Sequence, residues 1–132
     1  MSTAPAPSRP LVLVVDDEVE IRLALKLGLE TEFEVHLASS AEEAEGMLAT
    51  RGYNVLLCDH LMQGEDGLPF LMRMRQKYPE VQRIMMTSYI NPELLARSDS
   101  LAGLSACLMK PLSLATVVAA IRKAQAGPRS KL

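Results

Sequence analysis

The first apolar run of the chain is Leu11-Val12-Leu13-Val14-Val15, and two carboxylates, Asp16 and Asp17, follow it directly. A short run rich in valine and leucine is typical of a strand that is buried on both faces of a sheet. Three later runs also end at a polar side chain: Asp59 follows Val55–Cys58, Thr87 follows Ile84–Met86 and Lys110 follows Ala106–Met109. The chain therefore repeats one pattern, a buried strand with a polar residue at its carboxyl end.

Apolar residues at helical spacing lie between these runs. The expected strands are residues 11–15, 34–38, 55–58, 83–87 and 106–109, and the expected helices are residues 18–32, about 40–51, 68–78, 92–101 and 113–125. Either Ser39 or Ser40 caps the second helix, with Glu43 in a capping box. Strands that alternate with helices predict an α/β fold of parallel βαβ units, which bind ligands at the carboxyl ends of the strands.

Composition excludes several classes of protein. The chain has 132 residues, 48% of them hydrophobic, which fits one domain with a core. A net charge of −2 gives no basic field for direct nucleic-acid binding. No apolar run reaches the roughly 20 residues of a membrane span, and no signal peptide is present. The two cysteines, Cys58 and Cys107, lie in apolar runs, so we expect buried, reduced thiols and a cytoplasmic protein.

The expected organisation is a flexible N-terminal arm over residues 1–9, one domain over residues 10–126, and a flexible tail or linker start over residues 127–132. Pro5, Pro7 and Pro10 disfavour a helix in the arm. The chain is either a stand-alone domain that acts by docking or a fragment of a protein with a C-terminal output domain.

Three carboxylates at one edge of a sheet repel each other unless a cation lies among them. Asp16, Asp17 and Asp59 offer the oxygen ligands that Mg²⁺ prefers, and Mn²⁺ is an alternative. Asp16 and Asp17 alone fit equally well a loop that begins the next helix. Asp59, at the end of a separate strand, favours the metal site.

Asp59 is either a metal ligand only or also a nucleophile. The sequence offers few other nucleophiles, because His36 and His60 are not spaced for a triad, and we expect His60 to face either solvent or the rim of the site. A carboxylate nucleophile beside Mg²⁺ forms an aspartyl phosphate. Thr87 can donate a hydrogen bond to a phosphoryl oxygen, and Lys110 can pair with its charge.

The chain resembles the receiver domain of bacterial two-component response regulators, including the chemotaxis regulators, over about residues 10–126. The matching residues are Asp16-Asp17-Glu18, Asp59 through Gly67, Thr87-Ser88 and Lys110-Pro111. The resemblance implies a flavodoxin-like (βα)5 three-layer sandwich with strand order 2-1-3-4-5. It also implies a phosphorylation-controlled signalling switch that assists its own phosphorylation and dephosphorylation and is not an enzyme in the usual sense.

The resemblance further implies the role of each site residue. Asp59 accepts a phosphoryl group from a histidine kinase or phosphotransfer protein. Asp17, Asp59 and the backbone carbonyl of Leu61 bind Mg²⁺, with Asp16 acting partly through water. Thr87 and Lys110 contact the phosphoryl group, and Pro111 follows a cis peptide bond. A downstream protein target, an output domain or a second copy then docks on the face of the fourth helix, fifth strand and fifth helix.

The chain departs from the family pattern at several tuning positions. Gln63 replaces a usual proline, which we expect to loosen the loop. Cys107 replaces the usual aromatic switch residue, so we expect coupling from Thr87 and Ser88 either to be weaker or to use other parts, with Tyr89 as a candidate. Leu61 and Tyr89 are bulky at the positions that control water access, which predicts slow hydrolysis of the acyl phosphate.

Three alternatives stay open beside the switch. One is a phosphate-independent, receiver-like interaction module. A second is an Mg²⁺-dependent phosphohydrolase with an aspartyl-phosphate intermediate, which would need an acid at the position of Leu61. The weakest is a dinucleotide-binding domain, because no glycine-rich turn follows Val15.

Overall fold

The structure, a computed structural model, describes residues 9–89 and 91–126. The strands are β1 (Leu11–Val15), β2 (Glu34–Ala38), β3 (Val55–Asp59), β4 (Gln82–Thr87) and β5 (Ala106–Met109). The helices are α1 (Val19–Leu29), α2 (Ala41–Leu48), α3 (Gly67–Lys77), α4 (Pro92–Ala102) and α5 (Leu114–Ala126). The expected arm over residues 1–8 and the expected tail over residues 127–132 lie outside the described residues.

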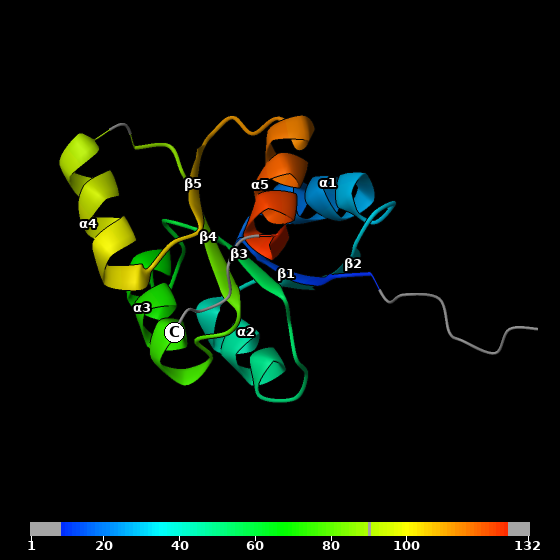
Figure 1. The fold of residues 1–132 in the computed structure, drawn as a ribbon, viewed down its shortest axis with the longest axis horizontal. Coiled ribbons are helices and arrows are strands. Elements are labelled where there is room, and N and C mark those ends of the chain that lie inside the picture. The colour runs from blue at the N-terminus through cyan, green and yellow to red at the C-terminus, as the bar shows by residue number, and fades with distance from the viewer. Residues whose placement is uncertain (1–8, 90, 127–132) are drawn as a thin grey trace, which may run out of the picture.

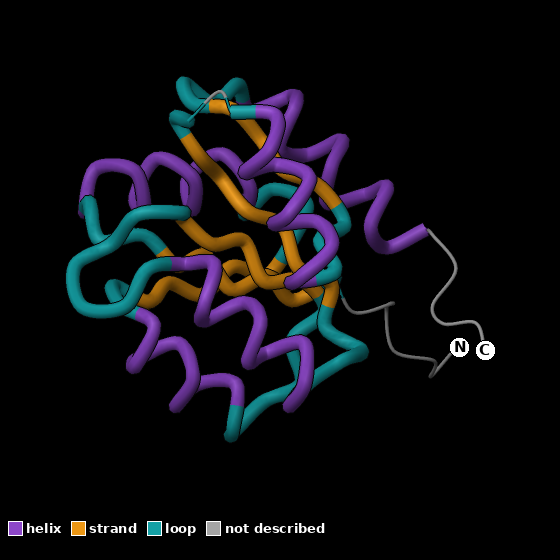
Figure 2. Tube along the Cα trace, turned by 90° about the vertical axis from the view of Figure 1, so that its left-hand side faces the viewer, coloured by secondary structure: helices purple, strands orange, loops and turns teal. Residues whose placement is uncertain are grey.

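The strands form a five-stranded sheet in the order β2-β1-β3-β4-β5, and every neighbouring pair is parallel. This is the flavodoxin-like topology, with α1 and α5 over one face and α2, α3 and α4 over the other (Figure 1). The same three layers are visible from the side (Figure 2). The described residues include no helix long and apolar enough to cross a membrane.

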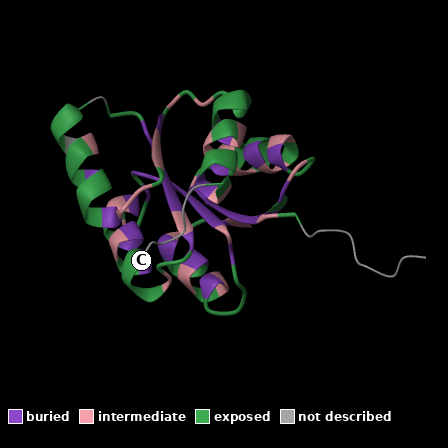
Figure 3. Cartoon of the chain, in the orientation of Figure 1, coloured by how far each residue is buried: buried purple, intermediate pink, exposed green. Residues whose placement is uncertain are grey.

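Alternating side chains of the central strands build a separate core on each face of the sheet. In β1, Leu11, Leu13 and Val15 pack toward α2 and α3, whereas Val12 and Val14 pack toward α1 and α5. The central strands β1, β3 and β4 are accordingly buried, while the outer faces of the helices are exposed (Figure 3). Burial on both faces explains why these strands are continuous apolar runs.

The expected helix over residues 18–32 ends earlier, at Leu29. The backbone N–H groups of Glu32 and Phe33 both donate to the carbonyl of Leu29, which turns the chain. Phe33 is then buried in the core on the α1 and α5 side. Burial of this aromatic ring, which helical spacing does not reveal, decides where the helix ends.

Ser40, rather than Ser39, is the N-cap of α2. Its hydroxyl accepts a hydrogen bond from the N–H of Glu43 at 3.0 Å. The Glu43 carboxylate accepts the N–H of Ser39 at 2.7 Å, so the reciprocal bond of the capping box is displaced by one residue. This cap fixes the first turn of α2 beside the end of β2.

Two arginines hold the carboxyl end of α4. The guanidinium of Arg83, which is buried, donates to the carbonyls of Ala102 and Gly103 at 2.8 and 3.2 Å. Arg75 donates to the carbonyl of Ser100 at 3.0 Å and to that of Leu101 at 3.2 Å. Cations at a helix C-terminus are favourable because the last carbonyls lack helical partners.

We expect Gly67→Ala to destabilise the protein by about 1–3 kcal/mol, because a Cβ there would clash with the backbone carbonyl of Asp59 and approach the Cys58 sulfur at 3.3 Å. Gly46→Ala is the matched control, since a Cβ at Gly46 in α2 has no neighbour within 4 Å. It should stabilise by roughly 0.5–1 kcal/mol. Urea unfolding measures both, and equal effects would contradict the packing at Gly67.

Candidate functional site

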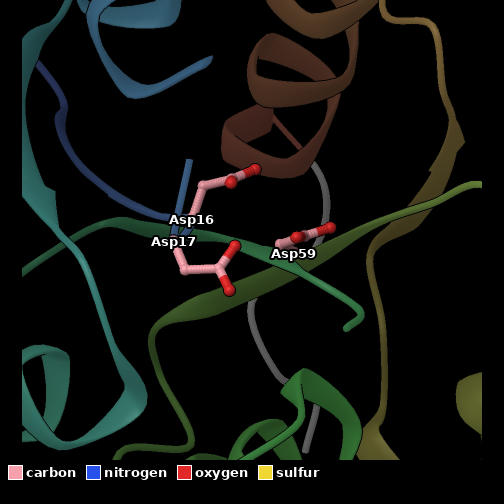
Figure 4. Close-up of side chains that lie close together, drawn as sticks. All are labelled: Asp16, Asp17 and Asp59. Carbon is pink, nitrogen blue, oxygen red and sulfur yellow. The ribbon is translucent and has the colours of Figure 1, made fainter. Parts of the chain in front are cut away.

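Three carboxylates meet at the carboxyl edge of the sheet. Asp16 and Asp17 follow β1, and Asp59 is the last residue of β3. Each can offer an oxygen that lies within 4.8 Å of the others (Figure 4). Asp16 is fully buried and Asp59 is 6% exposed, so two of the charges lie away from bulk water.

Backbone N–H groups orient the three side chains. The N–H of Glu18 donates to Asp16 at 2.9 Å, that of Gln63 to Asp17 at 2.9 Å, and that of His60 to Asp59 at 3.0 Å. The expectation that Gln63 loosens its loop stays a prediction; a proline at this position would have no N–H to donate to Asp17. The Gln63–Asp17 hydrogen bond connects the loop after β3 to the end of β1.

Lys110 supplies positive charge to this edge. Its Nζ lies 2.9 Å from Asp59 Oδ1 and 3.5 Å from Asp16 Oδ2. The Lys110 N–H donates to the carbonyl of Thr87 at 2.8 Å, which attaches the residue to β4. The Lys110–Pro111 peptide bond is cis.

The pKa values of this pair reflect burial and charge together. Burial raises the pKa of Asp59, and the charge of Asp16 adds to the rise, whereas the hydrogen bond from Lys110 opposes it. Burial alone would lower the pKa of Lys110, but its hydrogen bond to Asp59 and the two carboxylate charges raise it overall. Lys110 therefore stays protonated, whereas desolvation destabilises the ionised form of Asp59.

His60 is buried, so it does not face solvent, and it lies at the site, the other of the two expected positions. Its Nδ1 lies 2.8 Å from the Oγ1 of Thr87, which is itself 1% exposed. The ring of His60 also meets the ring of Tyr89 edge-on, with centroids 5.4 Å apart. The contact between His60 and Thr87 is thus the feature of this site that the sequence interpretation missed.

Strand register is the signal that points to His60. Asp59 pairs with Met86 in the β3–β4 ladder, so the next residue on each strand, His60 and Thr87, lie side by side. Side chains alternate along a strand, so His60 points to the same face of the sheet as Cys58. Periodicity within a single strand does not give this pairing.

Leu61, Thr87 and Ser88 lie around a hollow of about 400 Å³, whereas Tyr89, Cys107 and Pro111 are not among its lining residues. Its lining comprises Asp17, Glu18, Ile21, Asp59, His60, Leu61, Thr87, Ser88 and Lys110. Leu61 and Tyr89 are 45% and 51% exposed.

Of the two cysteines, Cys58 is buried as expected, and burial raises the pKa of its thiol far above the usual value. Cys107 is only half-buried, because β5 is an edge strand.

The donor set fits a hard divalent cation. Clustered carboxylates favour Mg²⁺ or Mn²⁺, which prefer oxygen ligands. No cysteine or histidine belongs to the cluster, so softer metals are disfavoured among the described residues.

Comparison with known proteins gives one consistent family. The response regulator receiver domain family matches residues 12–122. The hydrogenase transcriptional regulatory protein HoxA of Cupriavidus necator is 39% identical over 100 residues, which are 76% of this chain and 21% of that protein. HoxA of Bradyrhizobium diazoefficiens is 33% identical over 86% of this chain and 23% of its own length. The chain thus spans about a fifth of the length of these curated relatives.

Solved structures of receiver domains share the fold of this chain. The signal receiver domain of an HD domain-containing protein from Pseudomonas fluorescens superposes with a TM-score of 0.84 at 27% identity, covering 95% of this chain and 93% of that one. A CheY-like receiver domain protein from Methanospirillum hungatei gives 0.81 at 28% identity, covering 88% and 93%.

We expect Asp59→Asn to raise the urea midpoint of the metal-free protein at pH 7. The pKa of Asp59 is higher in the folded than in the unfolded chain, so the folded state binds that proton more tightly and ionisation above its pKa costs stability. The gain should shrink as the pH falls below that raised folded-state pKa and vanish below the lower pKa of the unfolded chain. Saturating Mg²⁺ should make the wild-type protein the more stable of the two, because an ion stabilises most the protein that binds it most tightly. A lower midpoint for the metal-free variant at pH 7 would show that the Lys110 pair outweighs desolvation.

Proposed function

Because this chain belongs to the response regulator receiver domain family, a family of two-component signalling, we propose that Asp59 is its phosphoacceptor. The single observation that carries this assignment is the ion pair of 2.9 Å between Asp59 and Lys110 at the floor of a polar hollow. The carboxylate is buried enough to exclude bulk water yet opens to a donor through the hollow. The transferred phosphoryl group comes from a histidine kinase or a phosphotransfer protein.

Lys110 and Thr87 stabilise the transferred group. An incoming phosphoryl group brings about 1.5 to 2 negative charges beside carboxylates that already repel. The Lys110 ammonium reaches both Asp59 and Asp16, so it can follow the charge from the carboxylate to the phosphoryl oxygens. Thr87 is the last residue of the neighbouring strand β4, and its hydroxyl can donate one further hydrogen bond to a phosphoryl oxygen.

Asp16, Asp17, Asp59 and the backbone carbonyl of Leu61 would hold Mg²⁺, with Asp16 acting partly through water. When bound, the ion supplies positive charge that neutralises the transferring phosphoryl oxygens. The protein's own contribution is to orient these carboxylates through the N–H groups of Glu18, Gln63 and His60.

The output face consists of α4, β5 and α5. β5 is an edge strand of the sheet, and its end leads directly to Lys110. α4 and β5 carry the exposed side chains of Leu101 and Met109. A downstream protein, an output domain of a longer regulator or a second copy of the chain would dock here when the ends of β4 and β5 respond to the phosphoryl group.

We expect acetyl phosphate with Mg²⁺ to add one phosphoryl group to the protein, detected as an intact-mass increase. Asp59→Asn should show no increase, and omission of Mg²⁺ should prevent it in the wild-type protein. Thr87→Ala should still be labelled but more slowly, because it lacks one donor to the phosphoryl oxygens.

Absence of labelling in the wild-type protein, also with a phosphorylated histidine donor, would contradict the phosphoacceptor role. That outcome would favour a phosphate-independent interaction module. Labelling that persists in Asp59→Asn would place the acceptor elsewhere.

We also expect the phosphorylated protein to decay slowly, and Leu61→Asn to hasten the decay by roughly fivefold. Leu61 is apolar at the rim of the hollow and cannot orient the attacking water. One added hydrogen bond of about 1 kcal/mol corresponds to roughly that factor in rate. Leu27→Asn in α1 is the matched control, since Leu27 is a 73% exposed leucine outside the hollow. Equal decay in both variants would show that Leu61 does not control water.

A further inference from the structure

The histidine beside the phosphoacceptor has an unusually fixed position. The backbone N–H of His60 donates to the carbonyl of Met86 at 2.8 Å, and its carbonyl accepts the N–H of Gly67 at 2.7 Å. The side chain is 7% exposed, and its Nδ1 lies 2.8 Å from Thr87 Oγ1. Because the backbone is held on both sides, the imidazole offers Thr87 a partner at a set place.

The hydroxyl of Thr87 has a limited capacity for hydrogen bonds. It has one hydrogen to donate and two lone pairs to accept with. The N–H of Tyr89 donates to this oxygen at 3.0 Å and so occupies one lone pair. The hydroxyl hydrogen is then free to point at the Nδ1 of a neutral His60 ring. A hydrogen directed at His60 is not available to a phosphoryl group on Asp59.

We propose that His60 is a positioning residue that holds the Thr87 hydroxyl in the resting protein and gives it up on phosphorylation. This inference rests on the proposed role of Asp59 as phosphoacceptor. Phosphoryl oxygens only accept hydrogen bonds, so they compete with Nδ1 for the same hydrogen. The strength of the His60–Thr87 hydrogen bond thereby sets how readily the phosphorylated conformation forms.

The same histidine connects Thr87 to an exposed ring. His60 and Tyr89 meet edge-on at an interplanar angle of 88°, and Tyr89 lies between the end of β4 and the start of α4. Cys107, which pairs with Met85 in the β4–β5 ladder, provides no ring on that side. Release of Thr87 therefore changes the surroundings of the His60–Tyr89 pair. This matters because Cys107 stands where the family usually has an aromatic residue that moves with the threonine.

Affinity for beryllofluoride with Mg²⁺, a phosphoryl mimic, tests the proposal. His60→Phe keeps a ring but removes Nδ1, so the resting state loses a hydrogen bond and the affinity should rise about 2- to 10-fold. His60→Asn restores a polar atom that can bond the hydroxyl, and its affinity should return to within about twofold of the wild-type value. In a Thr87→Ala background, His60→Phe should change nothing. Thermal unfolding midpoints verify that each variant is folded.

An unchanged or weaker affinity in folded His60→Phe would overturn the proposal, as would an equal gain in the Thr87→Ala background. The wild-type protein gives a second test that needs no His60 variant. The ¹⁵N signal of His60 Nδ1 should move on beryllofluoride addition, whereas that of His36, whose Nδ1 bonds the Tyr53 hydroxyl at 2.8 Å, should stay. The movement should be lost in Thr87→Ala, and a movement that persists there would overturn the proposal.

Failure of the underlying function is distinguishable from failure of this inference. The phosphoacceptor role, and the role of His60 with it, would be overturned in two cases. In the first, the wild-type protein binds no beryllofluoride; in the second, the Asp59→Asn variant binds it with the same affinity as the wild-type protein. If the wild-type protein bound it through Asp59 but His60→Phe had the wild-type affinity, only the positioning role would be overturned.

Discussion

The site depends on the electrostatic balance between two buried carboxylates, Asp16 and Asp59, and the ammonium group of Lys110. An uncompensated buried charge costs several kcal/mol, so the carboxylates are tolerable only where the fold brings a cation and N–H donors to them. Parallel pairing of β1, β3, β4 and β5 meets that requirement, because it places the ends of all four strands at one edge. Three acids beside one lysine still leave the edge negative, which explains why it suits a divalent cation.

Much of the fold follows from the sequence alone, since each central strand is buried on both faces and appears as an uninterrupted apolar run. The strand at residues 11–15, for example, is predicted with its observed bounds. Helix ends are less predictable because tertiary contacts decide them. The chain leaves α1 at Leu29 so that Phe33 can enter the core, and no local pattern in residues 18–32 signals this.

In the candidate site, too, some features follow from the sequence and others depend on tertiary contacts. That Asp16, Asp17 and Asp59 come together follows from strand order, but the partners of each side chain do not. The burial of His60 against Thr87 depends on the register of two strands, and the bond from Gln63 to Asp17 depends on the path of a loop. Cys107 is more exposed than an apolar run implies because β5 has a neighbour on one side only.

The arginines at the end of α4 hold one end of this helix through its last carbonyls. Arg83 and Arg75 bind the carbonyls of its last turn, whereas its first turn follows the segment that begins at Thr87. A helix of 11 residues is about 16 Å long. With one end fixed, a shift at the other would become a rotation, and α4 would act as a lever whose pivot is its C-terminal turn. A small displacement beside Thr87 would thus change the angle of an entire exposed surface rather than its position.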